Sequence, residues 1–130
     1  AYLFTVSFVG KANYALNIPS VIQGGEVPLC IQTNEITDPT LSIRMKVVGP
    51  DQKSEVSDLV LSNPSKYMMI KSKMSELRQL VISKLGKKQY LKGNIRLGKK
   101  RGIYNVLFEI KRRTQKGIVE RTINRSVYVR

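Results

Sequence analysis

The side chains best suited to bind a ligand are lysines and arginines gathered in one part of the chain. Residues 84–130 hold fifteen basic and two acidic residues, a net charge of +13, whereas residues 1–83 hold eight and seven, a net charge of +1. A field this uneven favours phosphate, sulfate or carboxylate partners. The candidate anion-binding residues are Lys87, Lys88, Lys92, Arg96, Lys99, Lys100, Arg101, Lys111, Arg112, Arg113 and Lys116.

The basic clusters leave the class of partner open. Surface lysines also protect sheet edges and keep proteins soluble without binding any ligand. Tyr90, Tyr104 and Tyr128 lie among the charges and could stack on bases, but no RNA-binding signature accompanies them and Tyr104 fits a core position better. One alternative partner is therefore an anionic polymer, such as a glycosaminoglycan or a nucleic acid, or an acidic membrane surface. One contiguous basic face would favour such a binder, whereas cations scattered over several faces would favour a scaffold for protein contacts.

The sequence offers no residues for catalysis or for holding a metal or cofactor. It contains no histidine, which removes Ser-His and Cys-His nucleophiles and the commonest metal ligand. The single cysteine, Cys30, lies in the apolar run Val27–Ile31 and is expected to be a small buried residue. We therefore predict that the protein is not an enzyme, has no catalytic, cofactor-binding or metal-binding residues, and takes no small-molecule substrate.

The glycine-rich segment Gly93–Lys100 matches most of the pattern of a phosphate-binding loop. Lys100, however, stands where a Ser or Thr would hold magnesium. A helix should follow such a loop, but Gly102–Ile110 alternates like a strand. We therefore expect a basic hairpin punctuated by glycines.

Alternating apolar and polar residues indicate an all-β fold. Residues 41–47 are apolar at every odd position and residues 104–110 at every even position. Turn residues follow at Gly49–Asp51, and Arg113–Gly117 is expected to be a hairpin loop. The 42% hydrophobic content suits a folded domain better than a disordered basic tail. We predict a mainly all-β fold, an antiparallel immunoglobulin-like β-sandwich of seven to eight strands, as a single domain over residues 1–130.

The start of the chain has two interpretations. Residues 1–12 could be the remnant of a secretory leader. They could instead form a strand with Tyr2, Phe4, Val6 and Phe8 on one face, and we favour this strand because the period of two is regular.

Residues 72–86 are the one segment with helical spacing. The apolar residues recur every three or four positions, Ser72 could cap the start, and Gly86 could end the helix. We predict one short helix here, and a strand through Leu80–Ile82 is the alternative.

Two segments resemble a known family. Asn13–Gly25, with Tyr14 and Pro19, resembles the opening of the first macroglobulin-like domain of alpha-macroglobulins, complement components and insect thioester-containing proteins. Gly102–Ile110 followed by Gly117–Val129 resembles the last hairpin of that domain. The resemblance implies a non-enzymatic interaction or scaffold module of a secreted protein of defence or protease trapping. Its partners would be other proteins or neighbouring domains of a longer chain, it would act in innate immunity outside the cell, and no catalytic residue is implied.

Other assignments remain open. The turn Gly24–Glu26 before an apolar strand is similar to that of an arrestin-like trafficking adaptor. The basic residues 84–130 would also suit a matrix-type or nucleic-acid-associated protein. An intracellular location is the alternative to secretion. Asn124-Arg-Ser126 is a glycosylation sequon that matters only in a secreted chain.

Overall fold

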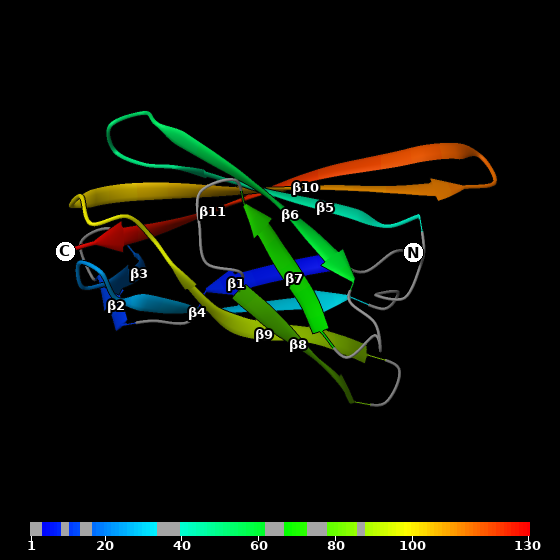
Figure 1. Ribbon diagram of the computed structural model, residues 1–130, viewed down its shortest axis with the longest axis horizontal. Coiled ribbons are helices and arrows are strands. Elements are labelled where there is room, and N and C mark those ends of the chain that lie inside the picture. The colour runs from blue at the N-terminus through cyan, green and yellow to red at the C-terminus, as the bar shows by residue number, and fades with distance from the viewer. Residues whose placement is uncertain are drawn as a thin grey trace.

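The computed structural model describes residues 4–8, 11–13, 17–33, 40–61, 67–72, 78–85 and 88–130, and this part of the chain is built from strands (Figure 1). The strands are β1 (Phe4–Phe8), β2 (Lys11–Asn13), β3 (Ile18–Val21), β4 (Glu26–Thr33), β5 (Ser42–Val48), β6 (Ser54–Leu61), β7 (Tyr67–Ser72), β8 (Arg78–Leu85), β9 (Lys88–Arg96), β10 (Gly102–Thr114) and β11 (Gly117–Val129). The all-β sandwich expected from the sequence is confirmed, with eleven strands rather than seven or eight. Among the described residues, no helix is long and apolar enough to cross a membrane.

The strands form one hydrogen-bonded series that turns back over itself. Its order is β1-β4-β9-β8-β7-β6-β5-β10-β11-β3-β2, and every neighbouring pair is antiparallel except β3 with β11. Figure 1 shows the result as two facing layers, with β1, β4 and β9 in one and β5, β10 and β11 in the other. β6, β7 and β8 carry the series from one layer to the other.

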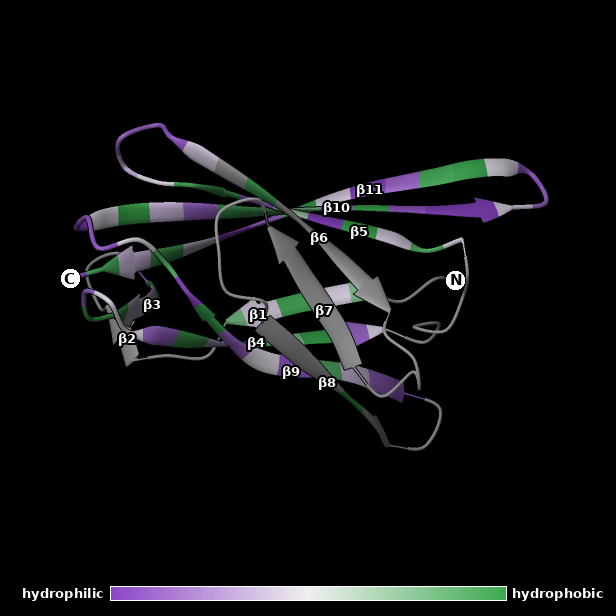
Figure 2. Cartoon of the chain, viewed as in Figure 1, coloured by the Kyte–Doolittle hydropathy of each residue, from purple (hydrophilic) through white to green (hydrophobic). Residues whose placement is uncertain are grey.

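The core lies between the two layers. Strand side chains alternate between faces, so every second residue of the inner strands points inward. On β1 the buried positions are Phe4, Val6 and Phe8, which confirms the strand expected at the start of the chain for residues 4–8, while Tyr2 lies outside the described residues. The rings of Phe8 and Phe108 meet across the layers at 6.3 Å between centroids. Figure 2 shows the corresponding alternation of hydrophobic and hydrophilic residues along β10.

A side chain joins the two layers where their edges approach. Arg125 on β11 donates from Nε to the backbone oxygen of Val6 on β1, at 2.8 Å. Its Nη1 also donates to the backbone oxygen of Asn124, at 2.9 Å. The guanidinium thus supplies a bond to the edge of β1, whose backbone is hydrogen-bonded to β4 on the other side.

The helix predicted over residues 72–86 is wrong for its described part. Arg78–Leu85 is the strand β8, hydrogen-bonded to β7 on one side and to β9 on the other. Two ladders satisfy the backbone groups that a helix would have paired internally, so tertiary pairing overrides the local spacing of apolar residues. The alternative strand through Leu80–Ile82 is confirmed, and residues 73–77 and 86 lie outside the described residues.

Two further expectations need correction. β9 and β10 do not form a hairpin, because β9 pairs with β4 and β8 while β10 pairs with β5 and β11. The segment between them, residues 97–101, is a connection from one layer to the other. Cys30 is half-buried rather than buried, since it lies on β4 between the inward-facing Leu29 and Ile31 and points outward.

Candidate anion-binding surfaces

The candidate basic residues do not share one face of the molecule. Lys88, Lys92 and Arg96 lie on the outer face of β9, in one layer of the sandwich. Lys99, Lys100 and Arg101 occupy the connection between the layers, and Lys111, Arg112, Arg113 and Lys116 lie at the far end of the β10–β11 hairpin. Lys87 lies outside the described residues. Residues 102–110 of β10 separate the last two groups, which places Arg101 and Lys111 roughly 33 Å apart along the strand.

The cations on β9 are spaced along one strand. Lys88, Lys92 and Arg96 are four residues apart, and therefore about 13 Å from one to the next. Two of them already have partners, since the Lys92 ammonium lies 5.4 Å from the centroid of the Tyr90 ring and Arg96 Nη2 lies 3.5 Å from Glu26 Oε1. Wide spacing and partial pairing make this stripe a weak site for a single anion.

The connection between β9 and β10 gathers its cations more closely. Lys99, Lys100 and Arg101 are consecutive and exposed, while two of their backbone oxygens accept hydrogen bonds from elsewhere in the fold. Gln23 Nε2 donates to Lys99 O at 2.8 Å, and the Tyr104 hydroxyl donates to Lys100 O at 2.8 Å. The backbone is therefore held in place while the three charged side chains face solvent.

Two glycines fix the same connection by close packing. A Cβ at Gly98 would lie 2.7 Å from the Tyr104 hydroxyl oxygen. Gly102 has φ +137°, a conformation that L side chains rarely adopt, and a Cβ there would lie 2.8 Å from Pro50 Cβ. Gly98 and Gly102 thus permit close approach of the backbone to Tyr104 and Pro50, respectively.

A fourth cation, Arg130, lies near this group because it follows the end of β11 that pairs with the start of β10. The Gln23 backbone N–H donates to Arg130 O at 3.2 Å, and Arg130 N donates to Val21 O at 2.9 Å. Gln23 therefore links the backbones of Lys99 and Arg130. We call Lys99, Lys100, Arg101 and Arg130 the loop cluster. Sequence reasoning missed Arg130 as a site residue because only strand pairing brings it here.

Tyr104 supports the loop cluster from the core. Its side chain is 5% exposed, which confirms that it is a core residue and not a stacking platform for bases. Burial raises the pKa of its hydroxyl above the usual 10.0, the hydrogen bond to Lys100 O lowers it, and the negative charge of Asp51 raises it further. The hydroxyl therefore stays protonated, and able to donate, to a higher pH than an exposed tyrosine.

The third group of basic residues lies on the β10–β11 hairpin, which extends beyond the end of the neighbouring strand β5. β10 and β11 pair along their whole length to the turn at Gln115 and Lys116, which confirms the predicted hairpin loop. The ladder between β5 and β10 ends at Lys111, and Thr40 Oγ1 accepts a bond from Arg113 N at 3.0 Å just beyond it. We call residues 111–122 the arm. It holds the predicted Lys111, Arg112, Arg113 and Lys116 together with Arg121, which the sequence analysis did not single out.

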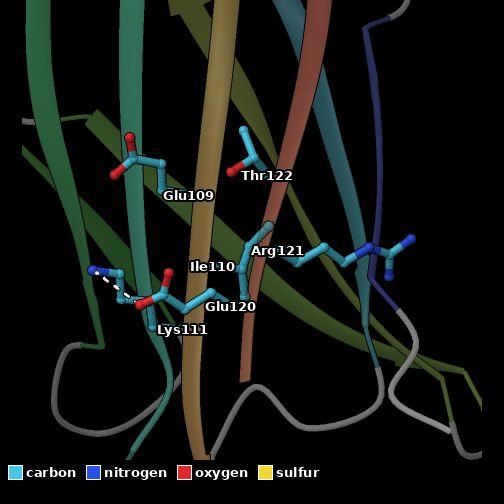
Figure 3. Close-up of a pocket in the computed structure, with 6 residues that line it drawn as sticks. All are labelled: Glu109, Ile110, Lys111, Glu120, Arg121 and Thr122. Atoms are coloured by element: carbon cyan, nitrogen blue, oxygen red, sulfur yellow. Dashed lines mark ion pairs between the residues drawn. The ribbon is translucent and has the colours of Figure 1, made fainter. Parts of the chain in front are cut away.

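A shallow depression of about 280 Å³ lies where the arm leaves the body of the sandwich (Figure 3). Both acidic residues of the basic segment line it, and Glu120 Oε1 lies 3.6 Å from Lys111 Nζ. Glu109 and Thr122 lie farther along the same two strands, while the Arg121 side chain points away on the other side of the hairpin (Figure 3). The two carboxylates disfavour an anion here, so the depression is not the anion site.

No protein-family model and no curated protein sequence matches the chain.

Proposed function

We propose that this chain is a non-enzymatic β-sandwich module that acts through surface contacts with other proteins or with neighbouring domains of a longer chain. The distribution of its cations is the observation that carries the proposal. They lie on the outer face of one layer, in the connection between layers and on a distant arm. A polymer that tracks one continuous groove would need them side by side. The resemblance to macroglobulin-like domains, and the secretion and defence role that it implies, belong to this proposal.

Affinity capture with charge-reversed variants tests the proposed protein contacts. The tagged chain is compared with a variant that carries K99E, K100E, R101E, R113E, K116E and R121E together. All six side chains are exposed, so folding should be retained, and circular dichroism checks this. We expect a set of proteins that both forms retain in high salt. Retention of nothing, or of nucleic acid alone and only by the native form, would refute the proposal.

The loop cluster supports a second candidate function, the binding of a soluble anionic polymer. Its four exposed cations come from two segments, and the backbone oxygens of Lys99, Lys100 and Arg130 are fixed by hydrogen bonds. Cations on a backbone that is held in this way lose less entropy on binding than cations on a free loop. Binding of this kind should weaken with salt because each phosphate contact releases counterions.

Heparin chromatography and RNA titration test this candidate. The K99E/K100E/R101E variant should elute from heparin at lower salt than the native chain. The slope of log affinity against log salt for RNA should fall by about one for each lost phosphate contact. Affinity that does not change with salt, or that the substitutions leave intact, would exclude the candidate.

A further inference from the structure

The arm differs from the rest of the surface because it extends away from both layers. Figure 1 shows the β10–β11 hairpin reaching past the ends of β5 and of the facing layer. Its backbone stays paired, since the ladder continues through Arg112 with Val119 and Arg113 with Ile118 to Thr114 with Gly117. A paired hairpin can enter a less polar medium without stranding the N–H and C=O groups of its inner ladder.

Both faces of the arm combine an aliphatic side chain with an arginine. Successive strand residues point to opposite faces, so Ile118 lies beside Arg113 on one face and Val119 beside Arg112 on the other. Ile118 is 63% exposed and Val119 is 46% exposed, and Ile118 is the most exposed of the large hydrophobic residues whose side-chain burial the structure describes. Figure 2 shows this hydrophobic segment of β11 close to the hydrophilic turn.

The charge of the arm is strongly positive. Residues 111–122 hold five basic residues and one acidic residue, Glu120, a net charge of +4. Glu120 is itself close to Lys111, with 3.6 Å between the charged atoms. The long, exposed side chains of Arg113, Lys116 and Arg121 can reach toward charged groups while their methylene stems cover apolar surface.

We propose that the arm is a membrane-contact element that places its tip in the headgroup region of a bilayer containing anionic lipids. A bilayer interface surrounds an inserted tip, so it contacts both faces at once and accepts aliphatic side chains about 5–10 Å deep. A nucleic acid or glycosaminoglycan would engage the cations of one face and gain nothing from Ile118 and Val119. Anionic headgroups provide the charge that complements the exposed cations Arg113, Lys116 and Arg121. This inference extends the anion-binding candidate to a second element and does not require the loop cluster.

Co-sedimentation with vesicles tests the arm against a charge-matched control. The vesicles contain phosphatidylserine and phosphatidylcholine in a one-to-two ratio, with pure phosphatidylcholine as the uncharged reference. The R113E/K116E/R121E variant should lose binding to the acidic vesicles by at least about tenfold. The K99E/K100E/R101E variant changes the net charge equally at the other end of β10 and should lose much less. Equal losses in the two variants would show general attraction and overturn the proposal.

A second pair of variants tests the aliphatic contact. I118S/V119S should weaken binding to acidic vesicles several-fold and leave heparin and RNA binding unchanged, because only the bilayer accepts aliphatic side chains. I22S/I103S is the matched control, since Ile22 and Ile103 are 57% and 41% exposed and lie outside the arm. If I118S/V119S binds vesicles like the native chain, or weakens heparin binding equally, the arm is not inserted and the proposal fails. If K99E/K100E/R101E loses heparin binding but keeps vesicle binding, that loss concerns the loop cluster and does not bear on the membrane proposal.

Discussion

The β10–β11 hairpin is one continuous ladder whose two parts have opposite properties. In the part next to the body, Tyr104, Val106, Phe108 and Ile110 alternate with half-buried or exposed neighbours and are at most 5% exposed. In the arm, by contrast, every residue of β11 up to Thr122 is exposed. The ladder between β10 and β11 continues through both parts, whereas the ladder between β5 and β10 ends at Lys111. The hairpin also reaches past the strands of the facing layer (Figure 1), and its residues are buried only where that layer covers them.

The part of the hairpin next to the body and the arm have different roles. Burial of apolar surface is the main source of stability, and it is concentrated where β1 and β4 cover the hairpin. The arm contributes little to that core, and most of its side chains are exposed to solvent, where they can contact a partner. Substitutions in the two parts should therefore separate stability from binding.

The largest difference is expected for core truncation against arm truncation. Phe108 is 0% exposed, so Phe108→Ala should lower the free energy of unfolding by about 3–5 kcal/mol. Arg113→Ala, on the exposed arm of the same strand, should change it by less than about 0.5 kcal/mol. Urea unfolding of both variants measures the two values. Comparable losses would show that the arm is part of the stabilising core.

Two glycines at opposite ends of the hairpin sharpen the comparison. Gly102 and Gly117 both have positive φ, +137° and +123°, but only Gly102 is crowded, by Pro50. Gly102→Ala should cost about 2–4 kcal/mol, from backbone strain and the clash together. Gly117→Ala should cost about 1 kcal/mol from the backbone alone. Thermal unfolding gives the order, and a larger loss at Gly117 would contradict the packing seen around Gly102.

Two arginines on β11 provide the next contrast. Arg125 donates to Val6 O across the layers at 2.8 Å, while Arg121, four residues earlier, is exposed on the arm. Arg125→Ala should lower the free energy of unfolding by about 1.5 kcal/mol through loss of a charged hydrogen bond. Arg121→Ala should have almost no effect on stability. Hydrogen exchange at β1 amides is a local readout and should rise only in the Arg125 variant.

The smallest effect concerns the Tyr104 hydroxyl and depends on pH. Tyr104→Phe removes the bond to Lys100 O and should cost about 1 kcal/mol at neutral pH. Because the folded state raises the pKa of Tyr104, folding favours the protonated hydroxyl. That stabilisation is present below pH 10.0, the usual tyrosine value, and is lost as the pH rises through the folded pKa. The native chain should therefore lose more stability than the variant above that pH, and parallel pH profiles would contradict the burial of this hydroxyl.

The sequence predicted well those strands that have one face in the core and the other face toward solvent. The alternation over residues 41–47 and 104–110 reports a buried and an outer face, and the structure confirms both. β8 was predicted as a helix, because its strand conformation comes from ladders with β7 and β9, which the local spacing of apolar residues does not encode. The supposed basic hairpin was wrong for a related reason, since the partners of β9 and β10 lie far away in sequence.

The candidate site was predictable as a set of charges but not as an arrangement. Consecutive residues such as Lys99, Lys100 and Arg101 remain neighbours in any fold. The addition of Arg130 depends on the register of the β10–β11 hairpin, which sets Val129 opposite Gly102, and on the bonds of Gln23. One signal for the arm was present in the sequence, because the apolar alternation of β10 stops after Ile110. Ile118 and Val119 are aliphatic residues of the returning strand, and they are exposed because the hairpin here reaches past the described strands of the facing layer.

The bond from Arg125 to Val6 has a consequence for how the chain reaches its native state. The two residues are 119 positions apart, and the parallel pairing of β3 with β11 also joins segments near the two ends of the described chain. Contacts of such high contact order form only after a large loss of chain entropy, which slows folding to the millisecond-to-second range. The bonds that β1 and β3 make with β11 therefore form only once the last strand is in place, whereas β5 to β9 each pair with a neighbour in sequence.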